Sequence, residues 1–153
     1  MPDQADIPNN SDAAENGRPN TTDWFLQAII ETYVTSGVEM GLTLTIGGSV
    51  VSGLLISGKT YFRELKDFLM ESSQQEGDIF ETLANDFGAL GPHIYDKPSD
   101  ATDEWKPDPI SFIHLKAARF HAPGQRGMPL KNGFLWRGRL EAVDAFSLGS
   151  FAD

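Results

Sequence analysis

The chain has 153 residues, with 12 Lys and Arg against 22 Asp and Glu, a formal net charge of −10, and no cysteine. The absence of cysteine excludes disulfides, thiolate metal sites and a cysteine nucleophile. The negative charge disfavours duplex nucleic acid and anionic membrane surfaces as partners, because both repel an acidic protein. The length fits one domain with or without a tail, and no apolar run approaches the 18 residues of a membrane span.

The first twenty residues are polar and acidic. Ile7 is the only large aliphatic side chain there after Met1. Such a segment cannot bury enough apolar area to offset the entropy lost on ordering. We therefore predict a disordered acidic tail over residues 1–20 and a single domain over residues 21–153.

A helix is predicted at the start of this domain. Asn20, Thr21 and Thr22 offer N-cap oxygens, and Gly37 suits the position after the last helical turn. Between them, apolar side chains recur every three or four residues and form one stripe: Phe25, Leu26, Ile29, Ile30, Tyr33 and Val34.

A β-hairpin is predicted next. Residues 38–46 alternate apolar and polar side chains, which is typical of a half-buried strand. Gly47 and Gly48 can adopt the positive φ that a tight hairpin turn requires. Residues 49–57 then form the return strand, in which Gly53 permits a sharp bend or a bulge.

A helical insertion follows the hairpin, at about residues 58–109. It contains a helix that starts near Gly58, a shorter helix at about residues 78–87, and a long exposed loop rich in Gly, Pro and acid over residues 88–109. Strand patterns return at residues 110–122, 134–143 and 145–149.

This order of elements predicts an α+β protein. We expect an N-terminal helix followed by a small five-stranded antiparallel barrel of the Sm-like or SH3-like type, with the helical insertion between strands 2 and 3. Residues 41–55 and 134–138 resemble the first strand pair and the fourth strand of the Sm-like barrel family.

No motif in the sequence favours catalysis. Residues 53–60 fit the phosphate-loop pattern G-x-x-x-x-G-K-[ST], but the intervening leucines and isoleucine favour a strand, so we interpret the match as chance. His114 and His121 are seven residues apart on one predicted strand and would face opposite sides unless a bulge intervenes. We predict no enzyme, no cofactor and no metal site.

Charge is distributed unevenly along the chain. Residues 1–108 hold 6 bases and 19 acids, net −13, whereas residues 109–153 hold 6 bases and 3 acids, net +3. The functional interpretation is a basic face, made of Lys116, Arg119, Arg137 and Arg139, that takes an acidic segment or a backbone phosphate. The alternative is an ordinary exposed face with internal pairs such as Arg139 with Glu141.

Trp105 is also a candidate interaction residue. It lies in the acidic loop, where a large ring has no local core to join. It either folds back as an anchor or contacts a partner.

Two C-terminal stretches, residues 111–118 (SFIHLKAA) and 133–149 (GFLWRGRLEAVDAFSLG), resemble the gas vesicle accessory protein U (GvpU) family. The hairpin at residues 42–57, with Lys59, Tyr61 and Phe62 after it, is also similar. The resemblance covers about residues 24–150. It implies a non-enzymatic cytoplasmic protein, associated with gas vesicles, that acts in vesicle assembly or clustering beside the shell.

The partners expected from these observations are gas vesicle shell proteins, other gas vesicle accessory proteins, and further copies of the chain. Contacts between oppositely charged regions would be weak, multivalent and reduced by salt. The alternative is a small-barrel protein that binds single-stranded RNA through Lys116, Arg137 and Arg139. The net charge of −10 makes nucleic acid the less favoured partner.

Overall fold

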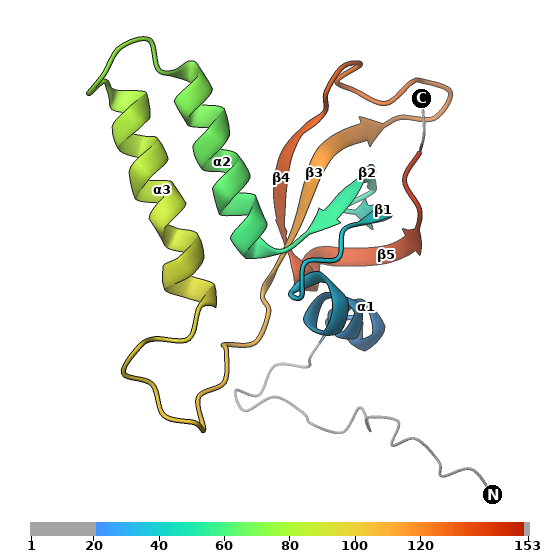
Figure 1. The fold of residues 1–153 in the computed structure, drawn as a ribbon. Helices are drawn as coiled ribbons and strands as arrows, with labels where there is room; N and C mark the ends of the chain where they lie inside the picture. Colours follow the sequence, from blue (N-terminus) through green and yellow to red (C-terminus); the bar gives the residue numbers. More distant parts are fainter. Residues whose placement is uncertain (1–20, 152–153) are drawn as a thin grey trace, which may run out of the picture.

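The computed structural model describes residues 21–151, so the acidic tail predicted for residues 1–20 lies outside the described residues. The fold is α+β, as predicted (Figure 1). The helical elements are α1 (Trp24–Ile29), the π-helical turn η1 (Ile30–Val34), α2 (Gly58–Ser72), α3 (Ile79–Tyr95) and the 3-10 turn η2 (Leu140–Ala142). The strands are β1 (Met40–Ile46), β2 (Ser49–Ile56), β3 (Phe112–His121), β4 (Phe134–Arg139) and β5 (Val143–Leu148).

The five strands form one antiparallel sheet in the order β4-β3-β2-β1-β5. The predicted closed barrel is wrong, because the sheet is open: β4 and β5 are its two edges, and no ladder joins them within residues 21–151. η2, a turn of only three residues that buries Leu140, joins these two edges directly. A connection this short cannot cross a flat sheet whose strands are about 4.8 Å apart, so the sheet is strongly bent and its two edges approach each other at η2.

The core lies between α1 with η1 and one face of the sheet, here called the inner face. Leu26, Ile29, Ile30 and Val34 are the buried helical residues, and they pack on buried side chains of β1, β2 and β3. The buried stripe is narrower than predicted, because two residues of the predicted stripe, Phe25 and Tyr33, remain about half exposed. The N-cap is Asp23 and not one of residues 20–22: its Oδ1 accepts hydrogen bonds from two backbone N–H groups of the first turn.

The predicted hairpin and its bend are both confirmed. Gly47 and Gly48 have φ of +55° and +80° at the turn between β1 and β2. The β2–β3 register shifts between Ser52 and Leu54, because Ala117 and Ala118 of β3 together oppose Gly53: the bulge lies in β3, with Ala117 at φ +49°. A Cβ on Gly53 would lie 2.8 Å from the Lys116 carbonyl oxygen, so only glycine lets the two strands approach this closely.

The bulge corrects the expectation for the two histidines. His114 and His121 would face opposite sides of a regular strand, but the register shift between them brings both to the same face. His114 pairs with Ile56 and His121 pairs with Val50. These two β2 residues are an even number of positions apart, so their side chains lie on the same face of the sheet. They lie at opposite ends of β3, so they do not form a common site.

The helical insertion is more regular than predicted. α3 continues to Tyr95, so residues 88–95 are helix and not loop. The glycines that suggested a loop lie in α3 with α2 packed against them: a Cβ on Gly88 would lie 2.6 Å from Lys66 Cδ, and one on Gly91 would lie 3.4 Å from the Lys59 carbonyl oxygen. The α2–α3 hairpin projects from one end of the sheet (Figure 1).

Candidate functional site

The predicted basic residues lie on the face of the sheet opposite α1, here called the outer face. Arg137 pairs with His114 across β4 and β3, and Lys116 follows His114 two residues later. Lys116 pairs with Leu54, and beyond the bulge Arg119 pairs with Ser52. Ser52 and Leu54 are two residues apart on β2, so their side chains lie on the same face of the sheet. The β-ladder therefore brings Lys116, Arg119, Arg137 and Arg139 to one face, as the sequence predicted for Arg137 and Arg139.

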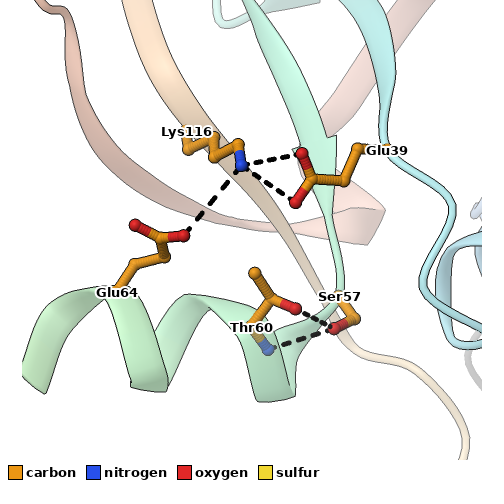
Figure 2. Close-up of polar contacts among 5 residues, drawn as sticks. All are labelled: Glu39, Ser57, Thr60, Glu64 and Lys116. Atoms are coloured by element: carbon orange, nitrogen blue, oxygen red, sulfur yellow. Dashed lines mark hydrogen bonds and ion pairs between the residues drawn. The ribbon is translucent and has the colours of Figure 1, made fainter.

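Lys116 is held by two carboxylates from the acidic part of the chain (Figure 2). Its Nζ lies 2.7 Å from Glu39 Oε2 and 4.0 Å from Glu64 Oε1. Glu64 is positioned by α2, whose N-terminus is capped by Ser57: the Ser57 Oγ accepts a hydrogen bond of 3.0 Å from the Thr60 N–H. Lys116 therefore connects β3, α2 and the segment before β1, and its charge is neutralised within the chain.

Arg137 joins the foot of the α2–α3 hairpin to the sheet. Its guanidinium carbon lies 3.7 Å from the ring centroid of Phe112 and 5.6 Å from that of Phe62, which is a cation–π arrangement. Arg137 Nη1 also lies 2.9 Å from His114 Nε2. The contacts bring together β3, β4 and α2, so this arginine serves the packing of the hairpin.

Burial shifts the pKa values of two neighbours of Arg137. His114 is 3 % exposed, and desolvation together with the positive charge of Arg137 lowers its pKa from 6.5 to about 3. His114 is therefore neutral at physiological pH and can accept a hydrogen bond from the guanidinium. Burial also raises the pKa of Tyr95, which Arg137 partly opposes by favouring the phenolate.

The remaining predicted residues lie apart from this cluster. Arg139 forms the ion pair with Glu141, at 3.0 Å, that the alternative interpretation anticipated. Arg119 donates from Nε to the Pro129 carbonyl oxygen at 3.2 Å. Trp105 is half-buried in the segment of residues 96–111. Their role in binding a partner stays a prediction.

Two exposed cations were missed by the sequence analysis. Arg126 and Lys131 lie in the segment of residues 122–133 between β3 and β4, which contains no acid. The segment of residues 96–111 holds 5 acids and 2 bases, and most of these side chains are exposed. The two segments lie at opposite ends of the molecule (Figure 1). The net charge of each segment can be counted from the sequence and could have identified both segments as candidate interaction sites.

In the described part of the chain, the geometry favours no catalytic or metal site. Residues 53–56 of the phosphate-loop pattern lie in β2, and Lys59 Nζ pairs with Asp96 Oδ1 at 2.6 Å. Ser52 Oγ and His121 Nε2 are 2.6 Å apart, but Ser52 is 2 % exposed within the sheet. The hollow beside Ser52 is about 110 Å³, below the roughly 300 Å³ of the smallest ligand pockets. A second hollow, beside His121, is about 340 Å³, but its lining includes no carboxylate. Within residues 21–151, no three His, Asp or Glu side chains could hold a metal ion together.

The described helices give no candidate for a membrane span, since none combines the necessary length and apolar content. The structure defines a class of small α+β protein in which a helical hairpin projects from an open antiparallel sheet. Residues 23–151 match the family model described as gas vesicle protein GvpU-like. The chain belongs to this gas vesicle accessory family, as the sequence resemblance predicted. Comparisons with curated proteins and with solved structures gave no match.

Proposed function

We propose that the chain is a non-enzymatic cytoplasmic protein that assists gas vesicle assembly or controls vesicle clustering through weak, multivalent contacts. The contacts would join copies of the chain to one another and to the vesicle shell or other accessory proteins. Membership of the gas vesicle family supports the cellular setting. The distribution of charge supports the mode of action.

One observation carries this proposal: oppositely charged segments lie at opposite ends of the molecule (Figure 1). The acidic segment of residues 96–111 and the basic segment of residues 122–133 are too far apart to neutralise each other in one copy. The acidic end of one copy would meet the basic end of the next. Such a head-to-tail contact does not close on itself and extends into open assemblies.

The proposal predicts that self-association falls with salt. Light scattering of the purified chain should be highest near 50 mM salt and fall strongly by 500 mM, because the Debye length shortens from roughly 14 Å to about 4 Å. Scattering that is unchanged across this range would contradict the electrostatic mechanism.

Charge reversal identifies the segments involved. The double variant Arg126→Glu, Lys131→Glu should lose association at 50 mM salt, and mixing it with Asp103→Lys, Glu104→Lys should restore it. The charge-matched comparison is Arg126→Glu alone against Arg63→Glu, because each reverses one exposed arginine and only Arg126 lies in the basic segment. Equal loss with the control would point to total charge and not to these segments.

A further inference from the structure

The second edge of β5 is open. Within the described residues β5 pairs with β1 alone, and from η2 onward it leads away from β4, the other edge strand (Figure 1). Four of its six residues are exposed. The Gly149 N–H donates to the Gly41 carbonyl oxygen, and the backbone groups of alternate residues in an antiparallel strand face opposite sides. The N–H and C=O groups of Phe146 and Leu148 therefore point away from β1, where a further strand would lie.

This edge lacks the features by which proteins protect an exposed strand. A lysine, a proline or an inward-pointing charge commonly prevents pairing with another chain. β5 has no lysine or proline, and its one charged residue, Asp144, accepts a hydrogen bond from the Gly47 N–H. The register shift with β1 lies at the same end, so the pairing of residues 145–148 is regular. β4, by contrast, carries Arg137 and Arg139, so β5 is the edge better suited to receive a strand.

Apolar side chains line this edge on the inner face of the sheet. Phe146 and Leu148 pair with core residues of β1, so their side chains point to the inner face as well. The ring centroid of Phe146 lies 5.8 Å from that of Phe25 on α1, which lies 5.8 Å from that of Trp24. The exposed fractions are 62 % for Leu148, 54 % for Trp24 and 48 % for Phe25. These four side chains, here called the apolar rim, would meet every second side chain of a strand added to β5.

The charges around this edge are negative. Residues 19–58, which include α1, β1 and β2, contain three acids and no base, and residues 140–153, which include β5, also contain three acids and no base. Two of these acids form ion pairs with bases of β3 and β4. Asp23 and Asp144 lie next to residues of the apolar rim in sequence. This field, with the net charge of −10, attracts a cationic partner and repels an acidic one.

We infer that β5 binds an extended segment of another protein as a sixth strand, and that apolar and cationic side chains alternate along this segment. Its apolar side chains would lie on the apolar rim, and its Lys or Arg side chains would lie on the other face, within the negative field. Main-chain hydrogen bonds to Phe146 and Leu148 would supply affinity, and the alternate side chains would supply specificity. The surface lies outside both charged segments, so the inference does not depend on the proposed function.

Other occupants fit this edge less well. Residues 1–20 contain four acids, one base and three prolines, so they combine the wrong charge with residues that cannot donate to a ladder. A second copy would bring a further net charge of −10 to an acidic surface. A lipid surface has no peptide groups to pair with the open backbone of β5.

Hydrogen exchange with a defined probe tests the inference. The probe is a blocked peptide of about eight residues in which lysine and valine alternate, long enough to cover β5. It should slow the exchange of the Phe146 and Leu148 amides more than about tenfold and leave the amides of β4 unchanged. Protection of β4, or of neither edge, would overturn the inference. Protection of the β5 amides already in the free chain would assign the edge to residues 1–20 or to a second copy, and so overturn it as well.

Two matched peptides separate strand pairing from attraction by charge. Glutamate in place of each lysine should weaken binding more than about tenfold, because like charges then meet. N-methylation of the valines should abolish binding with the charge unchanged, because residues opposite Phe146 and Leu148 share their face and exchange hydrogen bonds with them. Equal binding of the N-methylated peptide would show attraction by charge alone and would contradict strand addition.

A single substitution tests the apolar rim. Leu148→Asn should weaken binding of the lysine–valine peptide about fivefold, because the added strand would no longer cover a leucine side chain. Leu130→Asn is the matched control: Leu130 is 57 % exposed, against 62 % for Leu148, and lies between β3 and β4. Denaturant unfolding checks that both variants fold. Equal binding by the two folded variants would overturn the assignment to β5, whereas salt-independent scattering of the free chain would contradict only the head-to-tail proposal.

Discussion

Acidification should destabilise the fold through His114. The free energy of unfolding should begin to fall at a pH well above the range in which carboxylates titrate. The unfolded chain takes up a proton at this histidine as the pH falls below about 6.5, whereas the folded chain does so only near pH 3, because the pKa of His114 is lowered to about 3. Between these values the unfolded state binds more protons. The free energy of unfolding therefore falls as the pH falls, by about 2 kcal/mol at pH 5 relative to pH 8.

The measurement is denaturant unfolding at several pH values between 8 and 4. His114→Gln should lower stability at neutral pH, because it disturbs the contact with Arg137 and the packing on Tyr61, but it should flatten the decline toward acid. His93→Gln is the control, because His93 is exposed near the C-terminus of α3 and its loss should leave the profile parallel to that of the wild type. A His114→Gln profile parallel to the wild type would show that another group carries the acid sensitivity.

The parts of the fold that the sequence predicted are those set by local pattern. The alternation in residues 38–46, the Gly47–Gly48 turn and the helix from Gly58 each depend on side chains close in sequence, and all three are present. The bulge opposite Gly53 was also readable, because a glycine inside a strand indicates close backbone approach.

The parts that failed depend on contacts distant in sequence. Gly88 and Gly91 resemble loop residues when read locally, yet both lie within α3, where α2 packs against them. Whether β4 and β5 pair and close the sheet depends on the path of the chain through η2, and no local pattern encodes that path. The two faces of β3 could not be assigned without the position of the register shift.

The same limit applies to the candidate site. The sequence identified the cations of β3 and β4, but Lys116 is neutralised by Glu39, 77 residues away. No spacing rule predicts that pair. Such internal pairing, of Lys116 with Glu39 and of Arg139 with Glu141, leaves the predicted face with less free charge than its sequence indicates.

Gly53→Ala should be among the most destabilising single-methyl substitutions in the chain. The added Cβ would lie 2.8 Å from the Lys116 carbonyl oxygen and 3.1 Å from Ala118 Cα, both backbone atoms that cannot move without disturbing the β2–β3 ladder. Relief requires the strands to separate or the bulge to shift. Overpacking of this kind costs about 2–3 kcal/mol of unfolding free energy, which denaturant titration would measure.

Gly91→Ala is the matched control, since it adds the same methyl group between packed elements. There the Cβ would come no closer than 3.4 Å to its neighbours, which is ordinary van der Waals contact. Alanine also favours a helix over glycine by about 1 kcal/mol, so this variant should be neutral or more stable. Equal destabilisation of the two variants would contradict the argument, because only at Gly53 does the glycine fix the register. That register places Arg119 and His121 on the outer face. If the bulge were lost, both side chains would turn toward the core, so Gly53→Ala would also remove two polar side chains from the outer face.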